Sequence, residues 1–405
     1  MVINAQRIAA DIRAISAITQ TAGNGATRPT FTNEWRKACD YITEEAIRIG
    51  CMHRVDAHGN WHIRPKSLGW EKPAWLSGSH LDTVPHGGDY DGVAGVVAPL
   101  EVLRSAAEEK KEIPLELIIF AEEEGPTFSL GMLGSRSWVG DVSPKQLGEL
   151  RNKHSESYLE AGKVHGVISD QIINERFNRS AYLGLIELHI EQGPGMWQRD
   201  QRLAIVTAIA GRRQYKCEIL GQANHAGSTA MPDRHDALEG AAFIITSLRA
   251  LVQELSPQAV ATVGRIESLP NAVNVIPDRV SFTIDFRAPD DEVLKLGDEQ
   301  IRELITQTCQ QRGLQFKLEQ TEAIPAVAMD RQLCERLSDL AGGNVPTTIS
   351  GALHDSAVLG THLPTAMLFV PSRDGISHNP AEFSRIEDIA LGAELLAKAI
   401  SAGPL

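Results

Sequence analysis

The sequence predicts an α/β protein in which a central mixed sheet is flanked by helices and a smaller α+β domain is inserted into the chain. Apolar segments of strand length alternate with amphipathic helical segments between residues 61 and 121, and similar patterns return after residue 363. Between them, residues 211–326 follow the order strand, helix, strand, strand, helix, which is typical of a small α+β domain. We therefore expect a main domain of residues 1–210 plus 327–405 and an inserted domain of residues 211–326.

The main domain should contain two N-terminal helices, at residues 4–20 and 33–50, because apolar side chains recur there at three-to-four spacing. Further helices are expected at residues 93–109 and from about residue 386. The expected strands are residues 61–64, 74–77, 115–121, 181–192 and 363–371. Residues 141–180 are polar and irregular, with short helices expected, and contain no chemical motif.

The inserted domain should contain strands at residues 214–220, 260–267 and 279–287 and helices at residues 237–255 and 291–311. It also contains three polar residues, His225, Asn274 and Arg287, which lack metal-ligand spacing but could reach a substrate. The alternative is that the first two belong to turns and that Arg287 forms a strand-end ion pair with Asp285.

Composition and charge exclude several classes of protein. The 405 residues are 42% hydrophobic and 22% charged, which is enough for two separate cores, and the net charge of −13 disfavours non-specific nucleic acid binding. No apolar run approaches the roughly 20 residues of a membrane span, and the N-terminus lacks a signal-peptide pattern. The five cysteines form no C-x-x-C pair and are expected to be reduced. We expect a cytoplasmic protein that binds neither nucleic acid nor membrane.

The loop of residues 78–92 is the best candidate for a metal site. It packs two His and three Asp into fifteen residues directly after an apolar strand, and imidazole with carboxylate suits Zn²⁺ or a similar ion. His80 and Asp91 are the candidate ligands, and Asp82 could accept the second ring N–H of His80. The alternative is a polar glycine-rich turn with incidental histidines, so ligands from elsewhere in the chain must decide.

Such ligands follow other predicted strands. The strand at residues 115–121 runs into Glu122, Glu123 and Glu124, which favours a ligand and a general base over a solvated strand end. His189 lies on the polar face of the next strand, and His378 follows a buried strand and a glycine-containing loop, as His80 does. If His378 is a ligand, the C-terminal segment must close the main domain around the insertion.

Seven ordered motifs between residues 78 and 382 resemble one family. They are G-S-H-x-D-T…D-G (78–92), E-E-E-G (122–125), E-L-H-I-E-Q-G (187–193), N-H-A-G (224–227), N-A-V-N-V-I-P (271–277), D-F-R (285–287) and G-I-S-H-N-P-A-E (375–382). Together they resemble the hydantoinase/carbamoylase amidohydrolases, which cleave N-carbamoyl amino acids and allantoate. This family is a branch of the dinuclear-zinc aminoacylase and carboxypeptidase-like metallopeptidases.

The resemblance implies a zinc-exopeptidase-like fold and two divalent ions per chain, with Zn²⁺ expected first and Mn²⁺, Co²⁺ or Ni²⁺ left open. It implies that Asp91 bridges the ions and that Glu123 is the general base. The implied metal ligands are His80, Asp91, Glu124, His189 and His378. The implied substrate contacts are Gln192, His225, Asn274 and Arg287. The inserted domain, residues 211–326, is implied to be a lid and the surface of a homodimer, with His225 acting in cis or in trans.

The implied activity is metal-dependent hydrolysis of the carbamoyl C–N bond of an N-carbamoyl-L-amino acid or similar ureido acid, with release of ammonia and CO₂. Allantoate amidohydrolase is the first alternative. An aminoacylase or dipeptidase is disfavoured by His189, where peptidase relatives usually have an acid, and a non-catalytic binding protein is disfavoured because all ligands and the base are present. Departures from the family pattern at Thr127, Ala230 and Leu353 leave the substrate open.

Overall fold

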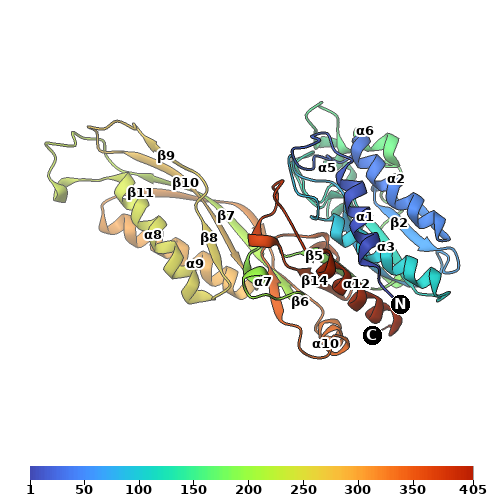
Figure 1. The fold of residues 1–405 in the computed structure, drawn as a ribbon. Coiled ribbons are helices and arrows are strands. Elements are labelled where there is room, and N and C mark those ends of the chain that lie inside the picture. Colours follow the sequence, from blue (N-terminus) through green and yellow to red (C-terminus); the bar gives the residue numbers. More distant parts are fainter. Residues whose placement is uncertain (405) are drawn as a thin grey trace. The chain divides into compact units, whose positions relative to one another are not determined.

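The computed structural model describes residues 1–404, which form two compact units (Figure 1). The first unit consists of Met1–Thr207, Met329–Thr348 and the described residues from Ala352 onward. The second consists of Ala208–Ala328 together with Ile349–Gly351. The second unit is thus inserted into the first, with boundaries slightly wider than residues 211–326. The boundaries widen because β6 (Ala204–Ile209) continues into the second unit and pairs there with β12 (Val327–Ala328).

The first unit is built on a mixed sheet, which confirms the predicted fold class. Within the described residues the sheet has nine strands in the order β1-β2-β4-β3-β5-β14-β6-β12, with β13 paired to β6. The strands not yet given are β1 (Cys51–Val55), β2 (Trp61–Pro65), β3 (Ala74–His80), β4 (Leu115–Phe120), β5 (Tyr182–Ile190), β13 (Thr347–Ser350) and β14 (Thr365–Val370). Adjacent strands β4, β3, β5 and β14 are parallel, so their carboxyl ends meet at one edge of the sheet.

Helices cover both faces of this sheet, which explains why its parallel strands are buried. Every residue of β3, β4 and β14 is buried. On one face pack α1 (Ala5–Ser16), α2 (Asn33–Arg48), α3 (Val93–Glu108) and α12 (Ile386–Ser401). On the other face, α4 (Leu133–Val139) and α11 (Asp355–Leu359) enclose a smaller core that includes Leu76, Phe120 and Trp138. The first and last helices, α1 and α12, lie side by side (Figure 1).

Shorter elements complete the first unit. They are α5 (Pro144–Glu149), α6 (Tyr158–Gly162), α7 (Gly195–Gln198), α10 (Arg331–Leu340) and 3-10 turns at Lys163–His165, Arg179–Ala181 and Arg373–Gly375. The segment of residues 141–180 contains the short helices α5 and α6 and the first two of these turns, which confirms the expected irregular segment with short helices. β1, β6, β13 and α10 were not predicted. β1 and β13 are short strands without a clear apolar alternation. β6 is a short apolar run and α10 has apolar residues at helical spacing, so the sequence did contain a signal for both.

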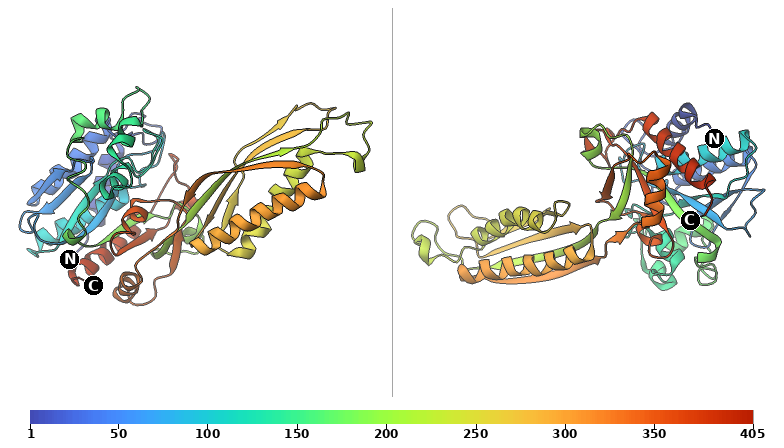
Figure 2. Two further views of the ribbon diagram at one scale, coloured as in Figure 1. Left: turned by 180° about the vertical axis from the view of Figure 1, so that it is seen from behind. Right: turned by 90° about the horizontal axis from the view of Figure 1, so that it is seen from below.

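The second unit is an antiparallel sheet with two helices on one face (Figure 2). Its strand order is β11-β7-β10-β8, with β9 also paired to β10. The strands are β7 (Gly211–Leu220), β8 (Val260–Thr262), β9 (Ile266–Leu269), β10 (Arg279–Ala288) and β11 (Gln315–Ile324). Helices α8 (Ala237–Leu255) and α9 (Asp291–Gln311) have the predicted bounds, and a 3-10 turn lies at Met231–Asp233.

Two strand predictions in this unit need correction. The single strand expected at residues 260–267 is two strands, because the chain leaves β10 at Gly264 and rejoins it further along. The strand β11 was missed. It pairs with β7 at the edge of the sheet, and its residues are mostly exposed or partly exposed, so it lacks the apolar alternation of a half-buried strand.

Candidate active site

The predicted metal ligands all lie in the first unit, at the carboxyl edge of its parallel strands. His80 is the last residue of β3, and His189 lies one residue before the end of β5. Glu123 and Glu124 follow β4, Asp91 directly precedes Gly92 and α3, and His378 lies in the loop after β14. The parallel order of β4, β3, β5 and β14 therefore brings together residues from both sides of the insertion.

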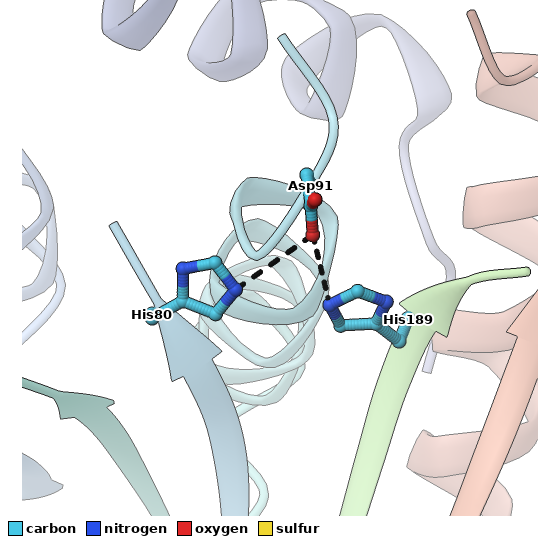
Figure 3. A group of neighbouring side chains, drawn as sticks. All are labelled: His80, Asp91 and His189. Carbon is cyan, nitrogen blue, oxygen red and sulfur yellow. Dashed lines mark ion pairs between the residues drawn. The ribbon is translucent and has the colours of Figure 1, made fainter. Parts of the chain in front are cut away.

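Asp91 lies at the centre of this group. Its Oδ1 is 3.7 Å from His80 Nε2 and 3.2 Å from His189 Nε2, and Figure 3 shows both imidazole rings directed at it. Its Oδ2 is 3.1 Å from His378 Nε2, which is also 3.4 Å from Glu124 Oε2. Two sets of potential ligands contain Asp91, His80–Asp91–His189 and Asp91–Glu124–His378, each with ligand atoms within 4.8 Å of one another. Asp91 is common to both sets and offers one oxygen to each.

Backbone carbonyls fix the tautomers of two histidines. His80 Nδ1 lies 2.9 Å from the carbonyl oxygen of Asp82, and His189 Nδ1 lies 2.9 Å from that of Ile190. Because a carbonyl can only accept, both Nδ1 atoms must donate, and Nε2 is the atom left to face Asp91. Donation from the second ring nitrogen is the usual arrangement of a metal-binding histidine.

His189 shows that a positive charge belongs in this site. Its Nε2 is buried, has no aligned hydrogen-bond partner and faces the oxygen of Asp91. Burial by itself lowers the pKa of His189, but the Asp91 carboxylate outweighs it and raises that pKa to about 9. A proton or a metal ion must therefore separate the two groups. Nitrogen and carboxylate donors converging from several strands are the ligand type of first-row divalent ions, so the residues fit a metal site.

The carboxylates lead to the same conclusion. Burial and then Glu124 raise the pKa of Glu123, and burial and then Asp91 raise the pKa of Glu124. Within the described residues, the ion-pair partners of Asp91, Glu123 and Glu124 are histidines rather than Lys or Arg. Negative charge crowded in a buried site without a fixed cation favours a bound cation.

A turn after β4 separates the side chain of Glu123 from that of Glu124. Glu122 has a positive φ of 55°, and its carboxylate accepts hydrogen bonds from the backbone N–H groups of Thr127 and Phe128. Glu124 then belongs to one ligand set. Glu123 belongs to neither, although its Oε2 lies 3.6 Å from His80 Nε2. Glu123 is therefore placed beside the ligands while its carboxylate remains available.

Gly92 explains the D-G sequence at residues 91–92. Its φ is 67°, and a Cβ at this position would lie 2.5 Å from the carbonyl oxygen of His80 and 2.6 Å from its ring. Because Gly92 has no side chain, the backbone can pass close to His80. Asp91 can therefore lie beside the imidazole of His80 just before α3 begins.

Asp82 acts through a different atom from the one predicted. The backbone carbonyl of Asp82 accepts from His80, whereas its carboxylate oxygen Oδ1 is 3.9 Å from Nδ1. The other carboxylate oxygen accepts from the backbone N–H of Glu124 at 3.1 Å. The Asp82 carboxylate therefore connects the β3 loop to the β4 loop.

The predicted substrate contacts lie in both units. Gln192 is in the first unit and donates from Nε2 to Asp91 Oδ2 at 2.9 Å. His225, Asn274 and Arg287 are in the second unit, where the backbone N–H of Ala226 donates to the carbonyl of Asn274. His225 Nδ1 accepts from the N–H groups of Gly227 and Ser228. These three residues remain proposed substrate contacts.

Arg287 is already paired within the second unit. Its Nε donates to Asp285 Oδ1 at 2.9 Å, and its Nη1 donates to the carbonyl of Gly351 at 2.7 Å. The sequence left a strand-end ion pair open as the alternative, and that ion pair is present. It orients the guanidinium.

Further buried polar residues surround the ligands. Glu187 accepts hydrogen bonds from the hydroxyls of Ser79 and Ser356, at 2.7 and 2.5 Å, beneath the ends of β3 and β5. The ring of His354 lies 4.4 Å from that of His189, and Asp355 accepts from the hydroxyl of Ser135. Of these, Ser135 and Ser356 gave no signal in the sequence, because a serine is common in and around short helices, whereas Ser79 lies within the G-S-H-x-D-T motif.

Comparisons with known proteins decide the family. The sequence profile of Peptidase family M20/M25/M40 matches residues 76–402, most of the chain. The chain belongs to this family. The family membership confirms that the protein is a hydrolase acting on amide-type C–N bonds, of a metal-dependent family, as the motifs implied.

Relatives within family M20/M25/M40 match along nearly the whole chain. N-carbamoyl-L-amino-acid amidohydrolase from Paenarthrobacter aurescens is 33% identical, with 98% of each chain covered. Allantoate amidohydrolase from Bacillus subtilis is 34% identical, with 93% of this chain and 92% of the relative covered. The crystal structure of a hydantoinase/carbamoylase family amidase from Burkholderia multivorans has a TM-score of 0.91 at 32% identity, covering 100% of this chain and 99% of that one. The predicted resemblance is thereby confirmed. Among the described residues, no helix is long and apolar enough to cross a membrane.

Proposed function

We propose that the protein hydrolyses the carbamoyl C–N bond of an N-carbamoyl-L-amino acid or a similar ureido acid, using two divalent ions held around Asp91. The observation that carries this proposal is the division of Asp91 between two ligand sets, with His80 and His189 on one side and Glu124 and His378 on the other. Similarity to amidohydrolases along the whole chain supports the substrate class.

Divalent ions held by these residues would supply Lewis acidity, which would activate water and polarise the carbonyl oxygen of the substrate. Glu123 takes the proton of the attacking water and passes it to the leaving nitrogen, because its carboxylate is near the ligands but in neither set. The C–N bond to the amino acid breaks as the water oxygen bonds to the carbamoyl carbon. The products are the amino acid and carbamate, which decomposes to ammonia and CO₂.

The second unit is proposed to supply the remaining substrate contacts and a homodimer surface. Arg287 offers a planar guanidinium for the substrate carboxylate, with Asp285 orienting it, and His225 and Asn274 offer polar groups from neighbouring loops. An inserted unit can close over a substrate as a lid. Cysteines are free thiols throughout the described residues, which suits the proposed cytoplasmic location.

Allantoate is the alternative substrate, because the relatives named for the two activities are nearly equally similar, at 33% and 34% identity. The test is ammonia release from a panel of allantoate, N-carbamoyl-L-amino acids and N-carbamoyl-β-alanine, with and without added Mn²⁺ or Zn²⁺. Turnover of N-carbamoyl-L-amino acids in preference to allantoate supports the proposal. Preference for allantoate would replace it with the alternative, and no ammonia from any member would overturn both.

A further inference from the structure

Glu382 connects the two loops that carry Asp91 and His378. Its side chain is buried, with the whole residue 5% exposed. Oε1 accepts hydrogen bonds from the backbone N–H groups of Tyr90 and Asp91, at 2.9 and 3.0 Å. Oε2 accepts from the hydroxyl of Ser377 at 2.8 Å, one residue before His378. One carboxylate therefore binds both loops, which come from opposite sides of the inserted unit.

The neighbouring sequence leaves room for this carboxylate. A Cβ at Gly88 would lie 2.1 Å from both Cδ and Oε1 of Glu382, so any side chain at residue 88 would displace the carboxylate. On its own loop, the backbone N–H of Glu382 donates to the carbonyl of Asn379 at 3.0 Å, which closes a turn just after His378. Gly88 and this turn together hold Glu382 against the loop of Asp91.

Glu382 is not placed as a ligand or a base. It belongs to neither set of ligands around Asp91, and both of its oxygens are already hydrogen-bonded. We infer that Glu382 is a positioning residue, which holds Asp91 and His378 at the separation that binding of the second ion requires. This inference rests on the proposed two-ion function.

The two ligand sets should depend on Glu382 to different degrees. His80 and His189 are residues of β3 and β5, so the sheet holds them, and backbone carbonyls fix their rings. Asp91 and His378 lie on loops, and Glu382 contacts both loops. Loss of Glu382 should therefore weaken the Asp91–Glu124–His378 set more than the His80–Asp91–His189 set.

The test compares Glu382→Ala and Glu382→Gln with the unaltered protein, and with Glu394→Ala as a control at an exposed position of α12. Zn²⁺ or Mn²⁺ content is measured by elemental analysis after equilibration with a graded series of chelator concentrations. The metal content of the unaltered protein is measured first. If the unaltered protein does not bind two ions, the proposed function fails, regardless of the result for the Glu382 variants.

Glu382→Ala should keep one ion at chelator concentrations where the unaltered protein keeps two. Its second site should bind metal about 10–100-fold more weakly, which is the usual effect of removing a group that orients metal ligands. Glu382→Gln should stay within a few-fold of the unaltered protein, because its amide oxygen can still accept from Tyr90 and Asp91. Equal loss in Glu382→Gln and Glu382→Ala would show that charge rather than hydrogen bonding matters, and would overturn the inference.

A purely structural role is separated by thermal unfolding with and without metal. Such a role would lower the melting temperature of the metal-free protein but leave the rise on adding metal unchanged, whereas a positioning role reduces that rise. If Glu382→Ala fails to fold, Ser377→Ala removes the link from Glu382 to the His378 loop, together with the longer contacts of this hydroxyl with Asp91 Oδ2 and Gln192 Nε2, both at 3.4 Å. It should weaken the same ion, by a smaller factor. Unchanged binding of both ions in the folded variants would overturn the inference.

Discussion

Asp91 Oδ2 lies 3.1 Å from His378 Nε2, although one residue precedes the inserted unit and the other follows it. The backbone of His378 has a positive φ of 54°, which is uncommon for a residue other than Gly, although Asn, Asp and His adopt it more often than the rest, and such positions cluster at functional sites. The contact requires β14 to lie beside β5, and hence the C-terminal segment to complete the sheet begun by the N-terminal one. The site therefore depends on the whole first unit.

Removal of metal should abolish activity. The reason is that Asp91, Glu123 and Glu124 form a negative cluster whose ion-pair partners, in the described chain, are histidines. We expect two ions per chain by elemental analysis, loss of ammonia release on dialysis against chelator, and recovery on adding Zn²⁺ or Mn²⁺. Full activity in chelator, with no stoichiometric metal, would contradict the metal site altogether.

Glu123→Gln should fold and bind metal as the unaltered protein does but lose at least ~10²-fold in kcat, the scale expected for removal of a general base. His189→Ala is the matched comparison, because it should lose metal instead of catalysis alone. Turnover rates, metal content and melting temperature distinguish the two. If Glu123→Gln turns over normally, the base is another residue, with Glu122 and Glu191 the next candidates.

His225 is predicted to complete the site of the neighbouring subunit. His225→Ala and Glu123→Gln should each be inactive alone. After subunit exchange in an equal mixture, about half the dimers are mixed and each has one intact site of two, so activity should recover to about a quarter. Subunit exchange is verified separately with differently tagged chains. No recovery after verified exchange would place His225 in the site of its own chain.

A buried charge network around His62 of β2 and Glu116 of β4 predicts a pH dependence of stability. Burial lowers the pKa of His62, but hydrogen bonds to Asp56 and Glu116 outweigh burial and raise it. Burial likewise opposes ionisation of both acids, yet His62 holds the pKa of each below its usual value. Arg64 also pairs with Glu116.

The sign of each contribution follows from these directions. The contribution of His62 is fully present below its unfolded pKa of about 6.5 and is lost as pH rises through its raised folded pKa. Those of Asp56 and Glu116 are present above about pH 4.3 and are lost as pH falls through their lowered folded pKa values.

The variant His62→Gln should therefore destabilise the protein most between about pH 4.5 and 6.5, by roughly 3 kcal/mol, the scale for removing one partner of a buried pair. The difference from the unaltered protein should shrink at higher pH. Denaturant unfolding of both proteins across this range, in the presence of chelator, gives the measurement. A difference independent of pH would show that His62 is neutral in the folded state.

The ligand residues could be predicted because their chemistry is local. His80, Asp91 and the glutamates after β4 stand at strand ends, where a polar run after an apolar one is unusual, and seven ordered motifs identified the family. Helices α8 and α9 have the predicted bounds because each has a strong apolar period and a capping Asp at its start. The edge strand β11 lacked such a period and was missed.

The amino-acid sequence by itself determined the alternation of strands and helices, the family and the types of residue that can hold metal. Each of these depends on patterns among residues that are close together in the sequence. Tertiary structure alone decided which atoms meet. It placed the carbonyl of Asp82, not its carboxylate, on His80, and it brought Glu382 under the loop of Asp91. The physical reason is that hydrogen bonds between distant loops depend on how strands order within the sheet, and no local pattern encodes that order.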